Sequence, residues 1–123
     1  MLAVGEHVLD EFPTVCKRMG AGFYGGLGGT HQELCGALSG GVLVIGAWLG
    51  RSELGGDDRS AMNMAALFRA RFLGKFGETQ CALLRDLVHA SDDLGCCAAL
   101  VGESTRLLLT LFLEMRQLSD RMI

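Results

Sequence analysis

Apolar residues recur every three or four positions along most of the chain, and the alternation typical of half-buried strands is scarce. This periodicity predicts an all-α protein, a compact bundle of about five to six helices. A glycine-rich loop interrupts the pattern before the central helix. The whole chain, residues 1–123, is expected to form a single helical domain.

Start and stop signals give approximate bounds for these helices. Pro13 suits the first turn of the second helix. Gly50 and Gly77 follow the third and fourth helices, where a helix commonly ends. The expected helices run from about Leu2 to Phe12, Pro13 to Gly20, Thr30 to Leu49, Asp57 or Asp58 to Phe76, Gln80 to Ala90, and Gly95 to Met122.

The expected caps are polar side chains just before the helices. Thr30 and Glu33 have the spacing of a capping box, which predicts that the third helix starts at Thr30. Thr79 is expected to cap the fifth helix, and Asp92 or Asp93 the last one.

The last helix carries one apolar stripe, which core packing or a dimer seam would explain. We expect a homodimer, because a short helical chain can cover such a stripe with a second copy. The stripe consists of Leu107, Leu108, Leu111, Met115 and Leu118.

Composition narrows the classes of function. The net charge is −3 with acids and bases interspersed, so no basic footprint for nucleic acid is present. The longest apolar run, residues 34–49, is short for a membrane span and contains glycines, which indicates a buried helix. The N-terminal residues lack the positive charge and apolar run of a signal peptide, so we expect a cytoplasmic protein. The odd number of cysteines, five, then argues against a disulfide framework.

The cysteines stand near helix starts. Cys35 follows the Thr30 cap, Cys81 follows Thr79, and Cys96 and Cys97 follow Asp93. The partial positive charge and free N–H groups of a helix start favour a thiolate, which attacks disulfides or binds metal. This effect should be strongest for Cys81 and weakest for Cys35. Free cysteines also simply fill space in many proteins, and Cys16 is expected to have a peripheral or packing role.

Metal-ligand spacing is poor, because the sequence contains no CxxC motif. His31 and Cys35 are four residues apart on the expected third helix and could share a face as two ligands. A solvated His31 at the first helical position is the simpler alternative. His7 and His89 are expected to be ordinary surface or interface histidines.

The glycines also have two interpretations. The GGLGG run precedes a helix, as a phosphate-binding loop does, but no strand precedes it and no nucleotide motif is present. Gly36 and Gly40 fall on one helix face and are expected to let another helix approach closely.

These residues together resemble a known family, the redox-active proteins named for a C, GCAxxG, C, C pattern. The matching segments are CGALSG at residues 35–40, the cysteine at residue 81 followed by ALL, and CCAALV at residues 96–101. The resemblance implies that Cys35, Cys81 and Cys97 are the functional thiols. The family usually carries another cysteine on its first helix, and Val4 stands at that position here.

Three hypotheses follow. In the first, Cys35, Cys81 and Cys97 converge for thiol–disulfide exchange or electron transfer with an unidentified redox partner. In the second, the same cysteines, with Cys96 or His31 as a further ligand, bind a metal ion or an iron–sulfur cluster. In the third, the chain is a helical interaction protein whose cysteines only pack.

Overall fold

The computed structural model describes residues 1–121. Within this range the expected all-α fold is confirmed: six α-helices and one short 3-10 helix, η1, form, and no strand does. The elements are α1 Leu2–Val8, α2 Thr14–Met19, η1 Ala21–Phe23, α3 Gly36–Leu49, α4 Arg59–Phe76, α5 Cys81–Ala90 and α6 Cys97–Arg121.

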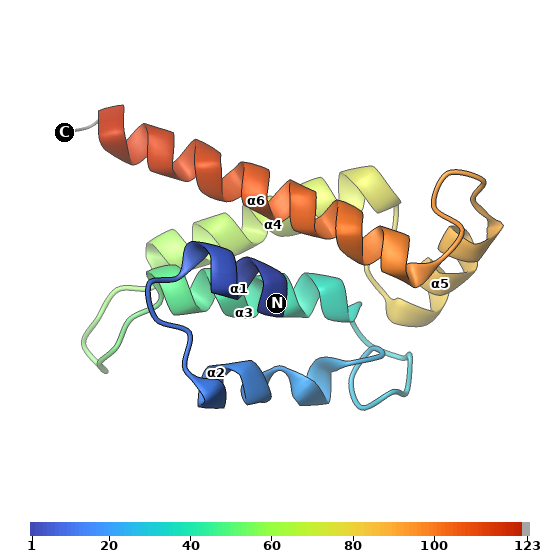
Figure 1. Cartoon of the computed structure of the whole chain (residues 1–123), viewed down its shortest axis with the longest axis horizontal. Coiled ribbons are helices and arrows are strands. Elements are labelled where there is room, and N and C mark those ends of the chain that lie inside the picture. The colour runs from blue at the N-terminus through green and yellow to red at the C-terminus, as the bar shows by residue number, and fades with distance from the viewer. Residues whose placement is uncertain (122–123) are drawn as a thin grey trace.

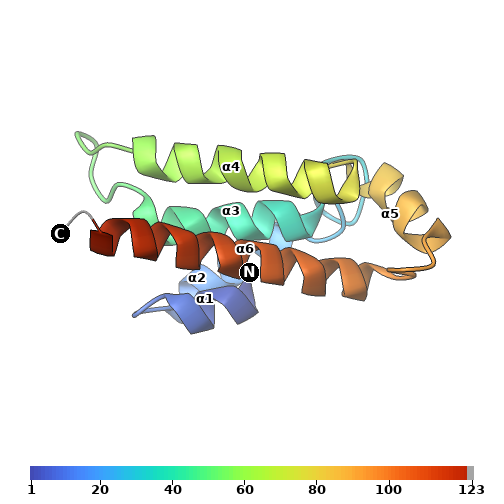
Figure 2. The same ribbon diagram turned by 90° about the horizontal axis from the view of Figure 1, so that it is seen from above.

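Three long helices, α3, α4 and α6, pack against one another and form the body of the molecule (Figure 2). The short α1 packs on α3 and α6, while α2 lies below α3 in Figure 1. Helix α5 stands across the end of the bundle where α6 begins (Figure 1). No helix in residues 1–121 is long and apolar enough to cross a membrane.

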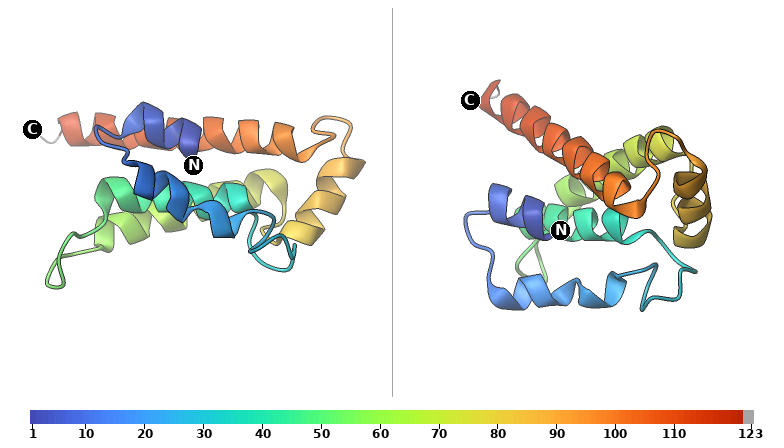
Figure 3. Two further views of the ribbon diagram at one scale, coloured as in Figure 1. Left: turned by 60° about the horizontal axis from the view of Figure 1, so that its bottom comes forward. Right: turned by 45° about the vertical axis from the view of Figure 1, so that its right-hand side comes forward.

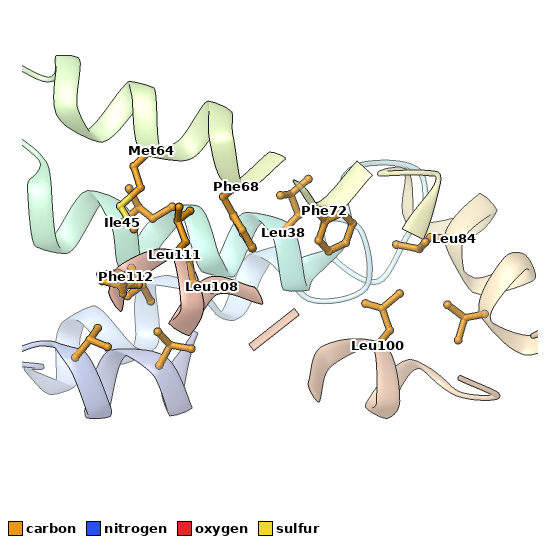
Figure 4. Packing of buried hydrophobic residues seen from close by; sticks show 14 residues of the cluster. Leu38, Ile45, Met64, Phe68, Phe72, Leu84, Leu100, Leu108, Leu111 and Phe112 are labelled. Atoms are coloured by element: carbon orange, nitrogen blue, oxygen red, sulfur yellow. The ribbon is translucent and has the colours of Figure 1, made fainter. Parts of the chain in front are cut away.

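The core lies between the facing apolar stripes of these helices (Figure 4). Phe68 and Phe72 of α4 are fully buried and point toward α3 and α6. Leu108 and Leu111 of α6 are buried opposite them, so the N-terminal part of the α6 stripe belongs to the core of its own chain. Leu118, at the C-terminal end of the stripe, is exposed.

The expected start of the third helix is wrong. Helix α3 begins at Gly36, with Cys35 as its N-cap, and not at Thr30. The backbone of His31 is left-handed, with φ at 63°, which stops any helix there. The hydroxyl of Thr30 instead donates back to the carbonyls of Gly26 and Leu27 in the glycine-rich loop.

Three other helix ends also differ from expectation. Helix α1 stops at Val8 because Leu9 is extended, and Pro13 is the N-cap of α2 instead of lying in its first turn. Gln80, and not Thr79, caps α5 by accepting a hydrogen bond from the N–H of Leu83.

Helix α4 ends as expected, since Gly77 adopts the left-handed conformation with φ at 81°. Before α6, the hydroxyl of Ser91 accepts from the N–H groups of Asp93 and Leu94. The expected end of the last helix, Met122, lies outside the described residues.

Close glycine contacts hold α3 in place. A Cβ on Gly40 would lie 3.3 Å from the Cβ of Met1, and one on Gly36 would lie 3.3 Å from the carbonyl oxygen of Phe23 in η1. Both glycines therefore allow a close approach, although the neighbour of Gly40 is the chain start and not another long helix. A closer contact with a long helix occurs at Gly41, where a Cβ would collide with Phe68 of α4.

Candidate functional site

A short backbone pairing joins the segments that precede α3 and α5. The N–H of Cys35 donates to the carbonyl of Thr79, and the N–H of Cys81 donates to the carbonyl of Glu33, both at 2.8 Å. Between them, Leu34 and Gln80 form an isolated antiparallel bridge. No pattern in the sequence predicts this pairing, which brings the starts of α3 and α5 to the same end of the bundle (Figure 3).

The pairing also sets the relation between Cys35 and Cys81. In a regular antiparallel pair these residues would be diagonal neighbours on one face, with Cα atoms about 7–8 Å apart. A disulfide usually needs a Cα separation of about 4.4–6.8 Å. A direct bond between Cys35 and Cys81 would therefore require a backbone shift.

Three cysteines from three helix starts line one cavity. Cys35 is the N-cap of α3, Cys81 is the first residue of α5, and Cys97 is the first residue of α6. All three line a partly open cavity of about 830 Å³. Cys97 is exposed, Cys35 is half-buried and Cys81 is buried, so the three thiols differ in their access to solvent.

His31 pairs with the buried thiol. Its Nδ1 atom lies 3.4 Å from Sγ of Cys81, which is within hydrogen-bonding range for sulfur. His31 does not share a helix face with Cys35, because α3 starts only after both residues. The alternative of a solvated His31 is also wrong, since the residue is half-buried and lines the cavity.

Backbone geometry holds this imidazole in place. The N–H of His31 donates to the carbonyl of Gly25, and its own carbonyl accepts from the N–H of Ala82 in the first turn of α5, both at 2.8 Å. Gly26 lies directly against Cys81: a Cβ there would come within 2.5 Å of the Cβ of Cys81. The glycine-rich loop thus packs its backbone on the thiol, which no larger residue would allow.

The pKa values of two of the thiols are raised, whereas the helix starts were expected to lower them. Burial raises the pKa of Cys35, although the backbone N–H groups of Ala37 and Leu38 at the start of α3 lower it in part. Burial also raises the pKa of Cys81, and the nearby Arg85 offsets only part of that rise. The expected favouring of thiolates by the helix starts is therefore wrong for these two cysteines, because desolvation outweighs the helix dipole.

The three thiols are close enough to influence one another. A negative charge on Cys81 or Cys97 opposes ionisation of Cys35, and one on Cys97 opposes ionisation of Cys81, so each raises the corresponding pKa. A negative charge on one of these sulfurs therefore makes the ionisation of Cys35 or Cys81 less favourable.

Arg85 and His89 also line the cavity, and sequence reasoning missed both. His89 is exposed, as expected of a surface histidine, and it also borders the same cavity as the thiols. Both residues could have been found from spacing alone: they follow Cys81 by four and eight positions, which places all three on one face of α5.

The remaining candidates lie outside this cavity. Cys96 is exposed beside Cys97, and Cys16 is half-buried on α2. Val4, at the position where the resemblance places a further cysteine, is 2% exposed and belongs to the core. Among residues 1–121, no three His, Cys, Asp or Glu side chains form a group that could hold a metal ion, so the metal-binding hypothesis gains no support from the geometry.

Comparison with known proteins identifies one related family. The family model described as "Putative redox-active protein (C_GCAxxG_C_C)" matches residues 1–111. This match covers the glycine-rich loop, the three cavity cysteines and most of α6. No curated protein and no solved structure matches the chain.

Proposed function

The chain belongs to the C_GCAxxG_C_C family of redox-active proteins, and we propose that it carries out thiol–disulfide exchange with the cavity cysteines. Cys97 is the attacking thiol in this proposal, because it is exposed and stands at a helix start. Cys81 is the resolving thiol, because it is buried and paired with His31.

The first step is attack on a small disulfide. The Cys97 thiolate forms a bond to one sulfur of the substrate, and the substrate's S–S bond breaks. The leaving thiolate takes a proton from water, and a mixed disulfide remains on Cys97.

The second step closes a disulfide within the protein. His31 takes the proton of Cys81, whose pKa is raised by burial so that it would otherwise stay protonated. The Cys81 sulfur then attacks Sγ of Cys97, and the second substrate thiolate leaves and receives that proton. In total, the substrate disulfide is reduced to two thiols, and two cysteines of the protein are oxidised to one disulfide.

The observation that carries the proposal is the meeting of Cys35, Cys81 and Cys97 at one cavity, with an imidazole on the most buried of them. Cys35 is a slower alternative resolving thiol in this proposal, so the mixed disulfide on Cys97 persists when Cys81 is absent. A cytoplasmic location fits this cycle, since cellular reductants there return the disulfide to thiols.

Trapping the mixed disulfide tests the proposal. Every variant carries Cys16→Ser and Cys96→Ser, which removes the thiols outside the cavity, and the reduced protein is treated with hydroxyethyl disulfide, a small neutral substrate. The three-thiol protein should retain no adduct and lose two protons in mass. Adding Cys81→Ser should leave one hydroxyethylthio adduct on Cys97, read by mass spectrometry.

Cys35→Ser in the same background is the matched control, and it should still close the internal disulfide. The proposal is overturned if Cys81→Ser closes its disulfide as readily as the three-thiol protein does. It is also overturned if Cys97→Ser consumes the disulfide at an unchanged rate.

A further inference from the structure

The cavity has charge of one sign on its walls. Most of its lining is apolar, from residues such as Leu84, Val88 and Leu100. Its charged or titratable groups other than the thiols are the amino group of Met1 and the side chains of Lys17, Tyr24, His31, Arg85 and His89, and no Asp or Glu among residues 1–121 lines it. The space therefore suits a molecule with an apolar body and a negative group.

Arg85 is the cation best placed to bind that group. It follows Cys81 by one helical turn on the same face of α5 and is exposed. Among residues 1–121, it makes no ion pair with a carboxylate. Lys17, in contrast, is already paired with Glu6 at 3.3 Å.

A second, smaller cleft continues from the cavity around Arg85. This cleft has a volume of about 280 Å³ and is lined by His31, Ala82, Arg85, Asp86 and His89. Asp86 is the single acid there, and it forms no ion pair with Arg85 within the described residues. The Arg85 guanidinium thus lies near the Cys81 thiol with no carboxylate bound to it among the described residues.

We propose that the substrate of this site is a small disulfide with an apolar body and a carboxylate, and that Arg85 binds the carboxylate. This inference rests on the proposed exchange reaction and names its substrate class. The planar guanidinium fork matches a carboxylate with two parallel hydrogen bonds. The apolar wall holds the body, and the disulfide then lies at the thiols, where Cys97 attacks it as described above.

Size and charge favour a carboxylate over a larger, more highly charged group. The cavity volume of about 830 Å³ falls in the range of small-molecule sites. One free guanidinium balances the single negative charge of a carboxylate.

The influence of Arg85 on Cys81 must be separated from its binding of substrate. Arg85 lowers the pKa of Cys81 in part, so its removal could slow exchange with any disulfide. Carboxylate recognition would slow only the reaction of a negatively charged disulfide. Comparing a charged with a neutral disulfide in the same variant therefore isolates the proposed role.

The experiment uses two aromatic disulfides that release coloured thiols. Dithiobisnitrobenzoate carries carboxylates and dithiodipyridine is neutral, and each is reacted with the reduced three-thiol protein. Arg85→Gln should slow the nitrobenzoate reaction roughly fivefold or more relative to the pyridine reaction, as loss of a charge-assisted hydrogen bond predicts. Arg85→Lys should retain part of the preference. Arg69→Gln is the matched control, because it removes the same charge from the exposed face of α4, away from the cavity.

The two proposals fail in different ways. If Arg85→Gln slows both reagents equally, or if Arg69→Gln has the same effect, Arg85 does not bind a carboxylate and the inference is wrong. Internal disulfide formation with the neutral reagent would still support the exchange reaction in that case. If neither reagent leads to an internal disulfide, the proposed function itself fails.

Discussion

The contact between Gly26 and Cys81 joins the glycine-rich loop to the chemistry of the site. Gly26 has a positive φ of 68°, and a Cβ on it would meet both the Cβ of Cys81 and the backbone of His31. Position 26 therefore requires glycine for two reasons: the left-handed backbone, and the space that the Cys81 side chain occupies. The pattern of glycines in the sequence indicated a tight loop, but it could not tell which glycine touches a cysteine.

Gly26→Ala should therefore destabilise the fold more than the same change at Gly28. Both glycines have a positive φ, so both substitutions carry the cost of about 1–2 kcal/mol for a left-handed residue. A Cβ on Gly28 meets nothing within 4 Å, whereas one on Gly26 overpacks Cys81 at a further cost of about 1–3 kcal/mol. Urea unfolding measures both, and equal losses would mean that Gly26 and Cys81 are not in contact.

The raised pKa values of Cys35 and Cys81 make stability depend on pH. Burial favours the neutral thiols in the folded state, so above the ordinary pKa of 9.0 the folded chain holds protons that the unfolded chain has lost. The stabilisation is complete below that pH and is lost as the pH rises through the higher folded pKa values.

Under reducing conditions, the free energy of unfolding should therefore fall as the pH rises above 9.0, the ordinary pKa of the two thiols. A Cys35→Ala, Cys81→Ala variant should show a smaller fall, because it lacks both thiols. Denaturant unfolding across this pH range measures the difference. Parallel curves for the two proteins would show that these thiols ionise as easily in the folded state as in the unfolded one.

At the scale of the helices, local signals predicted some ends and not others. The start of α4 near Asp58 and its end at Gly77 depend on nearby residues, and both were predictable. The start of α3 was not, because the segment around His31 is held by hydrogen bonds to Gly25 and to Ala82, a residue of another helix. Thr30 and Glu33 do have the spacing of a capping box, but this longer-range pairing prevents a helix from starting there.

Two glycines of α3 should respond in opposite ways to the same substitution. Gly41→Ala pushes a Cβ into Phe68 and should cost about 1–3 kcal/mol through overpacking. Gly46→Ala adds a Cβ in open space and should stabilise the helix by about 0.5–1 kcal/mol, since glycine is a poor helix former. Thermal unfolding distinguishes them, and a stabilised Gly41→Ala would show that α4 does not pack on α3 at this position.

At the scale of the whole molecule, the bundle brings together residues that the sequence separates. The common face of Cys81, Arg85 and His89 follows from helix periodicity and could be read from the sequence. The contact of His31 with Cys81, which are 50 positions apart, could not, because it depends on the backbone pairing between the segments that precede α3 and α5. Periodicity assigns residues to faces, whereas the packing of α5 and α6 decides which faces share a cavity.

The homodimer stays a prediction, but the fold shows that less of the α6 stripe is free to form a dimer interface than the sequence indicated. Leu108 and Leu111 are buried within their own chain. The exposed end of the α6 stripe at Leu118, together with the exposed Leu113 on the same helix, is left for a second copy. Light scattering at micromolar concentration should give twice the chain mass of 13.1 kDa. A monomer mass would remove the homodimer, and Leu118→Glu should produce that monomer if the seam lies there.

The pairing of the cysteines after oxidation tests the proposed exchange most directly. The Cys16→Ser, Cys96→Ser protein is oxidised with one equivalent of hydroxyethyl disulfide, digested under acid conditions, and its linked peptides are mapped by mass spectrometry. The proposed mechanism predicts a bond between Cys81 and Cys97. A bond between Cys35 and Cys81, or disulfides formed only between chains, would contradict it.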